Sequence, residues 1–306
     1  MNDTVLSSKY NVYGAITEKI VRAIREQKGK FVMPWHSIEE PLGFPINAAT
    51  ENPYRGANIL SLWIDALSKG FANGYWASYK QWQSLGAQVR YGERGSLIFF
   101  YKKFEAAETT DGVAEEAPRY VGKASWVFNA CQVEDWTPPA SKEPSPVVID
   151  ETVAAFVKAT EARIYHGYRM ARYRLDLDCI EMPSAAWFRD TETSSAAQSY
   201  HAVLLHELTH WTGPAHRCDR EFGQRFGDRA YAFEELIAEL GAAFLCAAFK
   251  IANEPRPDHA AYVAGWLEVL GSDPRAIFTA AHKAQEAIEY LSVLASAKLD
   301  RASEAV

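Results

Sequence analysis

The sequence contains few sulfur-bearing side chains. Its four cysteines are far apart and form no Cys-x-x-Cys pair, which excludes a disulfide framework or a cysteine-ligated zinc site as the basis of the fold. The last of its four methionines is at residue 182. Any later motif that requires a methionine after it is therefore incomplete. These residues are Cys131, Cys179, Cys218 and Cys246, and Met1, Met33, Met170 and Met182.

Long hydrophobic runs are also lacking. The most apolar segment, GAAFLCAAF at residues 241–249, is far shorter than the roughly 20 residues that a membrane-spanning helix needs. The first residues, MNDTVLSSKYNVYG, lack the basic and then apolar order of a signal peptide. We therefore expect a cytoplasmic protein with no membrane partner.

Positive charge is not in excess. The net charge is −7, from 32 Lys+Arg and 39 Asp+Glu, which argues against indiscriminate binding of polyanions. Residues 1–140 carry 15 basic and 15 acidic side chains, so residues 141–306 carry the remaining 17 and 24. The two halves of the chain therefore differ in character.

Length and composition predict two domains. A chain of 306 residues exceeds the roughly 250 residues at which single cores stop growing. Four prolines fall between residues 138 and 146, in a segment with no hydrophobic periodicity, which is typical of a linker. We predict a first domain over residues 1–137, a proline-rich linker over 138–149 and a second domain over 150–306.

Residue patterns predict an α+β fold. In the first half, three segments have helical patterns and two have strand patterns, with an acidic segment between the strands that is expected to be the loop of a long hairpin. In the second half, a helix and a strand precede two longer helices and a helical tail. The first-half helices are 13–27, 56–70 and 78–86, the strands 96–104 and 119–133, and the loop 105–118; the second-half helices are 150–162, about 196–212, 230–250 and the tail 257–300, and the strand is 173–183.

The segment DLDCIEMP, residues 176–183, has two interpretations. As an edge strand it would align an extended peptide through main-chain hydrogen bonds. A purely structural edge strand fits the sequence equally well.

The segment HELTHWTGPAH at residues 206–216 predicts a metal site. On a helix, His206 and His210 project from one face because they are four positions apart. Two imidazoles at this spacing can bind Zn²⁺, or another divalent metal such as Mn²⁺, and Glu207 can act as general base on a metal-bound water. Although an HExxH pattern also arises by chance, we predict that Glu207 is catalytic.

Two residues compete for the place of third ligand. The pattern HExxHxxGxxH would assign it to His216, but that class requires a downstream methionine turn, which the sequence lacks. The alternative is Glu235, in the helical segment YAFEELIAELGAAFLC, where the order ExxAE resembles the second helix of glutamate-type zincins. We assign Glu235 to the metal and Glu239 to the orientation of a ligand histidine, although glutamates opposite an apolar stripe usually face water.

Residues 54–103 combine aromatic and basic side chains. They hold seven Lys+Arg against two acidic residues, and eleven aromatic residues. Interleaved rings and cations suit single-stranded nucleic acid, because bases stack on rings while cations contact phosphates. Most of the rings are expected in the core. The candidate contacts expected at the surface are Arg55, Tyr79, Lys80, Trp82, Arg90 and Arg94.

The two halves together resemble the ArdC-type antirestriction proteins, which conjugative plasmids carry and which have relatives in plasmid primases. The segments that carry the resemblance are PYRGANILSLW, GYWASYKQWQSLGAQVRYGERG and VFNACQVE in the first half, and DCIEMP, HELTHWTG and YAFEELIAELGAAFLC in the second.

The resemblance implies an N-terminal domain that binds single-stranded DNA and a C-terminal zincin-like metallopeptidase domain. It also implies that the protein shields incoming plasmid DNA from host restriction. By position, His206, His210 and Glu235 would bind the metal and Glu207 would be the catalytic carboxylate. The sequence departs from the family pattern in PAHRCDRE, after the HExxH motif, and this departure keeps His216 open as a ligand.

Three functions compete on these grounds. The first is an antirestriction protein that binds single-stranded DNA and carries a peptidase-type domain, with a host restriction enzyme or another DNA-bound protein as a further partner. The alternative is a DNA-associated zinc metalloprotease that acts on DNA-bound proteins. A nonenzymatic mimic of DNA is disfavoured, because the first half has no acidic excess.

Overall fold

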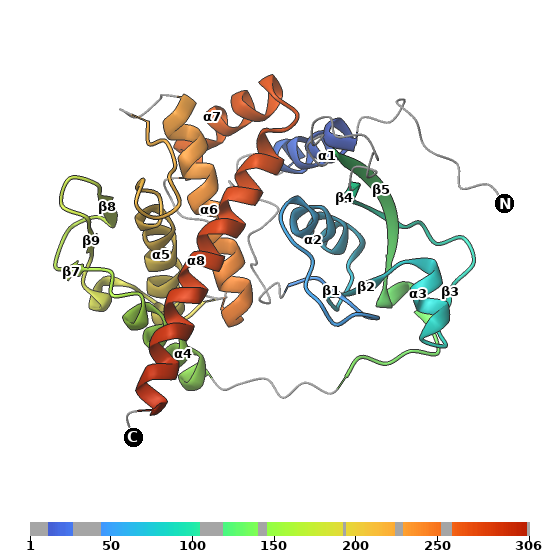
Figure 1. The fold of residues 1–306 in the computed structure, drawn as a ribbon, viewed down its shortest axis with the longest axis horizontal. Helices are drawn as coiled ribbons and strands as arrows, with labels where there is room; N and C mark the ends of the chain where they lie inside the picture. Colours follow the sequence, from blue (N-terminus) through green and yellow to red (C-terminus); the bar gives the residue numbers. More distant parts are fainter. Residues whose placement is uncertain are drawn as a thin grey trace, which may run out of the picture.

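The computed structural model describes residues 12–26, 44–104, 119–139, 146–191, 194–223, 229–251 and 259–304. Within these ranges the chain forms two lobes, with the long helix α8 (Ala276–Glu304) running between them (Figure 1). Among the described residues, no helix is both long and apolar enough to cross a bilayer. The α+β prediction is confirmed.

The N-terminal lobe is a small sheet with the helices α1, α2 and α3 around it. The sheet has the order β1-β2-β5-β4, and β4 and β5 pair antiparallel from Ser96↔Val127 to Phe104↔Arg119. The predicted hairpin loop, 105–118, lies outside the described residues, but the paired strands on either side of it agree with the prediction. The elements are α1 (Val12–Glu26), β1 (Ile46–Asn47), α2 (Ala57–Lys69), β2 (Tyr75–Ala77), α3 (Tyr79–Ser84), β3 (Gln88–Val89), β4 (Ser96–Phe104), β5 (Arg119–Asn129) and β6 (Val133–Glu134).

Local sequence explains where the helices of this lobe begin and end. Helix α2 ends at Gly70, whose φ of 65° lies in the left-handed region that glycine adopts without strain. Helix α3 begins at a capping box, in which the side chain of Ser78 accepts from the backbone N–H of Gln81 and the side chain of Gln81 accepts from the backbone N–H of Ser78.

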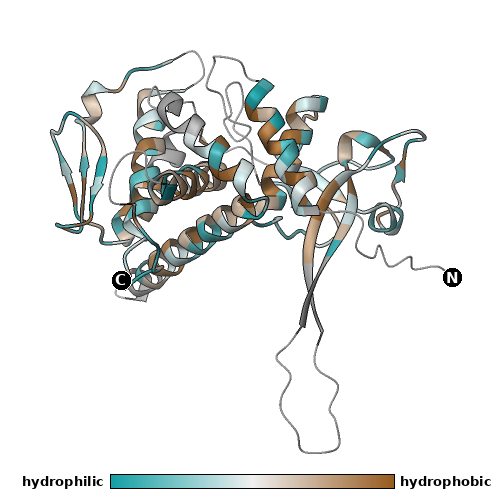
Figure 2. Ribbon diagram, turned by 90° about the horizontal axis from the view of Figure 1, so that it is seen from above, coloured by the Kyte–Doolittle hydropathy of each residue, from teal (hydrophilic) through white to brown (hydrophobic). Residues whose placement is uncertain are grey.

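The C-terminal lobe is a helical bundle with a three-stranded sheet at one end. The sheet has the order β7-β9-β8, and its middle strand contributes the buried residues Cys179, Ile180 and Met182. Figure 2 shows the hydrophobic colour of this lobe mostly along its helices. The elements are α4 (Pro146–Ala159), β7 (Ile164–His166), β8 (Arg172–Arg174), β9 (Cys179–Met182), α5 (Ala196–Trp211), α6 (Arg229–Phe249), α7 (His259–Ser272) and α8.

Two details of the second half differ from the sequence prediction. The strand expected at 173–183 is interrupted by a turn at 175–178, where Asp178 has a φ of 47°, and it forms the hairpin β8–β9. The helical tail is broken between Ser272 and Ala276 into α7 and α8. Of the predicted linker, residues 140–145 lie outside the described residues, and α4 begins at Pro146.

The two lobes share one hydrophobic core. Trp63 of α2 lies with its ring centroid 6.0 Å from that of Phe244 of α6, and Tyr13 of α1 lies 4.7 Å from Phe278 of α8. The buried cluster continues without interruption from these residues to Leu204 and Leu208 on α5. The N-terminal lobe is therefore packed against the helices that carry the HExxH segment.

Candidate metal centre and candidate nucleic-acid surface

Helices α5 and α6 bring the predicted metal ligands together. Helix α5 begins with a capping box at Ser195 and carries the HExxH segment on its last two turns. The two helices approach closely at Gly241 of α6, where an added Cβ would lie 2.5 Å from the Cγ2 of Thr209. A larger residue at 241 would push the helices apart, so this glycine sets the distance across which the ligands meet.

Three side chains converge between these helices. The Nε2 of His206 lies 3.5 Å from Oε2 of Glu235, and the Nε2 of His210 lies 3.6 Å from its Oε1. One nitrogen from each histidine and one oxygen from Glu235 all lie within 4.8 Å of one another. All three residues are buried. The structure thus brings together the three side chains that the sequence predicted as metal ligands.

The other nitrogen of each histidine faces a second carboxylate. His206 Nδ1 lies 3.5 Å from Oε2 of Glu239, the residue predicted to orient a ligand. His210 Nδ1 lies 3.1 Å from Oε1 of Glu234, a contact that the sequence prediction missed. A carboxylate at Nδ1 favours the tautomer that leaves Nε2 unprotonated for a metal.

Glu234 is held by a buried arginine. The Nε of Arg220 donates to Oε2 of Glu234 at 2.9 Å, and its Nη2 donates to Oε1 at 2.8 Å. The same guanidinium donates to the hydroxyl of Thr212 and to the carbonyl of Thr209, both at 2.7 Å. Arg220 thus joins the turn after α5 to α6 and fixes the carboxylate that contacts His210.

The charges of this cluster shift its pKa values. Burial lowers the pKa of His210, but the facing carboxylates of Glu235 and Glu234 outweigh burial and raise it to about 10. Burial raises the pKa of Glu235, but His210 and His206 hold it well below its usual range. The cluster therefore stabilises a positive charge between its carboxylates. Two imidazole nitrogens and one carboxylate oxygen are also the donor set that suits a catalytic divalent metal, so the residues fit such an ion.

Glu207 lies in the cleft that opens onto these ligands. The cleft has a volume of about 900 Å³, and its walls include β8 and the segment around Phe222. Strand β8 is an edge strand, because β9 occupies the middle of the sheet. The hypothesis that DLDCIEMP is the edge strand is therefore wrong, since its strand residues form β9; the edge beside the cleft belongs to Arg172 and Tyr173.

His216 does not take part in the cluster. It is exposed in the turn after α5, and the group of converging donor atoms does not include it. Gly213 serves packing in this turn, because an added Cβ would lie 2.3 Å from the ring of Phe222. The geometry therefore favours Glu235 over His216 as third ligand.

The residues predicted to contact nucleic acid divide into an exposed set and one buried exception. Trp82 is 0% exposed, and its indole N–H donates to the carbonyl of Phe128 at 2.9 Å. The expectation that Trp82 is at the surface is wrong, because it fills the small core between α3 and β6. The exposed residues of the set are Arg55, Tyr79, Lys80, Arg90 and Arg94.

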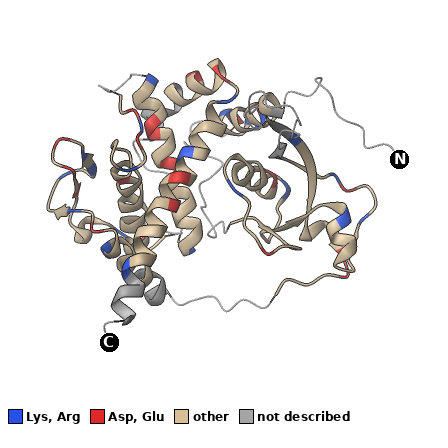
Figure 3. Ribbon diagram, viewed as in Figure 1, with Lys and Arg blue, Asp and Glu red and all other residues tan. Residues whose placement is uncertain are grey.

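Four of the exposed residues belong to one part of the N-terminal lobe. Tyr79 and Lys80 begin α3, a helix on which Figure 3 shows the basic colour, while Arg90 and Arg94 flank the turn before β4. Tyr79 accepts from Gln88 Nε2 at 3.1 Å, which ties α3 to β3. The ion pair of Arg90 with Glu93, at 2.9 Å, reduces its availability to a phosphate. We call the exposed residues Tyr79, Lys80, Tyr91 and Arg94 the α3 surface.

Comparison with known proteins places both lobes in one family. Residues 10–133 match a model described as the N-terminal domain of anti-restriction factor ArdC, and residues 151–283 match a zincin-like metallopeptidase model. The metal-free crystal structure of the antirestriction ArdC protein from the R388 plasmid aligns with a TM-score of 0.75 and 36% identity, over 94% of this chain and 98% of that one. The chain belongs to the ArdC family.

Other relatives of this ArdC-family protein extend the comparison. The uncharacterized protein y4eC of Sinorhizobium fredii is 43% identical over 92% of this chain and 91% of its own length. Two DNA primases TraC of Escherichia coli are 32% and 30% identical over 90% and 94% of this chain, which spans only 26% and 20% of their lengths. The R388 ArdC protein has also been solved with Mn(II) bound, with the same coverage and TM-score.

The sequence offered a weak signal for the residues that the prediction missed. Glu234 directly precedes the predicted ligand Glu235, so its side chain points about 100° further around α6, toward His210. Arg220 lies in PAHRCDRE, the segment that follows the HExxH motif. Nothing in its spacing showed that the chain turns back to bury it.

Proposed function

We propose that this ArdC-family protein binds single-stranded DNA, protects incoming plasmid DNA from host restriction and carries a metal-dependent peptidase in its second domain. We expect it to act in the cytoplasm, over the domains 1–137 and 150–306 separated by the linker 138–149. The observation that carries the peptidase part is the convergence of His206, His210 and Glu235 beside Glu207 in an open cleft.

Each residue of the cleft has a distinct role in this proposal. His206, His210 and Glu235 would hold Zn²⁺ or Mn²⁺, and a bound divalent metal acidifies water and polarises a carbonyl. Glu207 takes the proton from the attacking water and passes it to the leaving amine. Glu239 and Glu234 orient the two imidazoles. The exposed edge of β8 aligns an extended peptide by main-chain hydrogen bonds.

Replacement of Glu207 tests the peptidase. Glu207→Gln keeps the size of the side chain and removes the base, so we expect peptide cleavage to fall by about two to four orders of magnitude while the bound metal remains. The measurements are cleavage of proteins mixed with the metal-loaded protein and metal content by mass spectrometry. Equal cleavage by wild type and variant contradicts the assignment of Glu207.

The same variant shows whether protection depends on the peptidase. If protection requires cleavage of DNA-bound proteins, Glu207→Gln abolishes protection of an incoming plasmid in a restricting host. If DNA binding or docking of a restriction enzyme suffices, protection survives in the variant. The buried, fully assembled ligand set favours an active enzyme, because shielding alone does not require it.

The α3 surface supports the DNA-binding part of the proposal. Its exposed cations offer phosphate contacts, and its exposed rings offer stacking faces. The experiment is a salt titration of single-stranded DNA binding by the full chain and by the double variant Lys80→Ala, Arg94→Ala. Two lost phosphate contacts reduce the slope of log K against log salt by about 1.4. Lys158→Ala, an exposed change on α4, is the control, and an unchanged slope in the double variant contradicts the role of this surface.

A further inference from the structure

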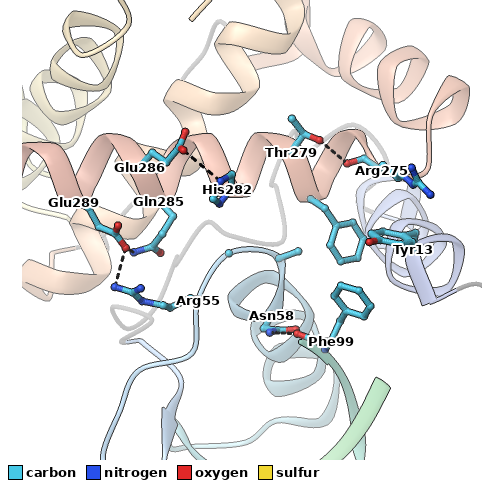
Figure 4. A pocket seen from close by; sticks show the side chains of 13 residues that line it. Tyr13, Arg55, Asn58, Phe99, Arg275, Thr279, His282, Gln285, Glu286 and Glu289 are labelled. Carbon is cyan, nitrogen blue, oxygen red and sulfur yellow. Dashed lines mark hydrogen bonds and ion pairs between the residues drawn. The ribbon is translucent and has the colours of Figure 1, made fainter. Parts of the chain in front are cut away.

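A second cavity lies between the two lobes. It has a volume of about 600 Å³ and is bounded by α8 on one side and by α1, the beginning of α2 and β4 on the other (Figure 4). We call it the interlobe pocket. Its size falls in the range of about 300–1,000 Å³ that is usual for small-ligand sites. It is separate from the metal cleft, since no lining residue is common to the two.

One end of the interlobe pocket is a cluster of three aromatic rings. The centroid of Tyr13 lies 5.1 Å from that of Phe99 and 4.7 Å from that of Phe278, and Phe99 lies 5.8 Å from Phe278. The guanidinium of Arg275 lies 5.2 Å from the Tyr13 centroid. Three elements that are distant in sequence thus present ring surface to one cavity, which suits a flat aromatic ligand.

The position of these rings is fixed by hydrogen bonds of the wall. The side chain of Asn58, in the first turn of α2, donates to the carbonyl of Phe99 at 2.6 Å and accepts from its N–H at 2.8 Å. The backbone of Phe99, from which its ring projects, is therefore held in place before any ligand arrives, which lowers the entropy lost on binding.

The polar group of the pocket is the carboxamide of Gln285. Its Nε2 donates to Oε1 of Glu289 at 3.0 Å, so the amide must turn its carbonyl oxygen away from that carboxylate. This carbonyl Oε1 is buried and accepts no hydrogen bond within the described parts of the chain. A buried acceptor without a donor is costly, at about 1–3 kcal/mol. A ligand that offers an N–H group would satisfy it.

The charges around the pocket largely neutralise one another. Glu289 pairs with Arg55 at 2.8 Å, and Glu286 pairs with Lys283 at 2.8 Å. The interior therefore favours a neutral ligand over an ion. Arg55, one of the residues predicted to contact nucleic acid, has a side chain that is 68% exposed, so its outer face remains open at the rim.

We propose that the interlobe pocket accepts one unpaired base of single-stranded DNA. The base stacks in the aromatic cluster, its amino group donates to Oε1 of Gln285, and the adjoining phosphate lies at the solvent-exposed rim of the pocket. This inference rests on the proposed binding of single-stranded DNA and adds to it a second contact region, away from the α3 surface.

The experiment uses the full chain and a short single-stranded oligonucleotide that carries one 2-aminopurine. This fluorescent base has an exocyclic amino group and is quenched when it stacks. We expect quenching on binding to wild type.

Gln285→Leu removes the acceptor and keeps the volume, and Phe278→Leu removes the ring and keeps an apolar wall. Each variant should weaken binding about tenfold and reduce the quenching. Val293→Ala, at an exposed position of α8 outside the pocket, is the control and should bind as wild type does.

The outcomes distinguish the two proposals. If wild type binds the oligonucleotide and both pocket variants match it in affinity and quenching, the interlobe pocket is not a base site, and the proposed function stands. If wild type binds no single-stranded DNA at any salt concentration, the proposed function fails, and this inference fails with it. Circular dichroism confirms that the variants fold. Gln285→Leu keeps the test decisive should Phe278→Leu unfold, because the lost acceptor had no partner within the described residues and the lost donor bonded to the exposed Glu289.

Discussion

The metal cleft and the α3 surface use charged residues in opposite ways. Around the predicted metal ligands, charged and ionisable side chains are buried and contact one another, so that Arg220 fixes Glu234 and Glu234 contacts His210. On the α3 surface, Lys80 and Arg94 are exposed to solvent. Buried charges interact strongly and must be paired, whereas exposed charges are screened and cost little. The cleft is therefore a rigid arrangement for chemistry, and the surface is adaptable to a flexible strand.

The largest expected effect comes from breaking a buried pair. Arg220→Met leaves Glu234 buried without its cation, and we expect a loss of about 3–5 kcal/mol in the free energy of unfolding. Arg55→Met breaks an exposed pair with Glu289, and we expect a loss of about 0–1 kcal/mol. Urea denaturation of the metal-free variants measures both. Equal losses would remove the distinction between the two kinds of charge.

Metal affinity sharpens the comparison within the cleft. Glu235→Gln replaces a proposed ligand, and we expect the dissociation constant for Zn²⁺ to rise by more than about a hundredfold. Glu239→Gln weakens only the contact to His206, and we expect the dissociation constant for Zn²⁺ to rise by about ten- to a hundredfold. Competition with a chromogenic chelator measures both. Glu268→Gln, an exposed change on α7, is the control. If Glu239→Gln raised the dissociation constant more than Glu235→Gln, Glu239 would be the metal ligand and Glu235 the orienting carboxylate.

A half-exposed ion pair should give the smallest effect. Partial burial raises the pKa of Asp178, but the guanidinium of Arg217, with Nη2 at 2.6 Å from Oδ1, outweighs burial and holds it below its usual value. Because the folded pKa is the lower one, the stabilisation is present above the unfolded pKa of about 3.9 and is lost as the pH falls through the folded pKa. We expect Asp178→Asn to cost about 1 kcal/mol at pH 7, since solvent screens the pair.

Unfolding in urea at pH 7 and at pH 3 measures this effect. The difference between wild type and Asp178→Asn should shrink at the lower pH. A difference that grew on acidification would show that Asp178 stabilises the fold by some means other than its charge. Asp176→Asn, at an exposed neighbouring position, should change stability less.

The same contrast explains how much the sequence could predict. The helical period alone predicts that His206 and His210 lie on one face. Glu235 and Glu239 could be predicted in the same way, because they also lie on one helix. Arg220 was not, since its burial depends on how the turn after α5 folds back. Trp82 was placed at the surface because its neighbours in SYKQWQ are polar, yet it is the residue of α3 that faces the small core. The central place of β9 depends on strand pairing between segments, which local alternation does not encode.

Helix α8 connects these regions in a way that bears on the evolution of the chain. It packs against α6, which carries Glu235, and it contributes Phe278 and Gln285 to the interlobe pocket. Either half produced alone would expose apolar surface that the other now covers, so gene rearrangements that separate them should be selected against. The TraC primases match this chain across both halves together, over 90% and 94% of its length. This is expected if the two halves are inherited as one unit.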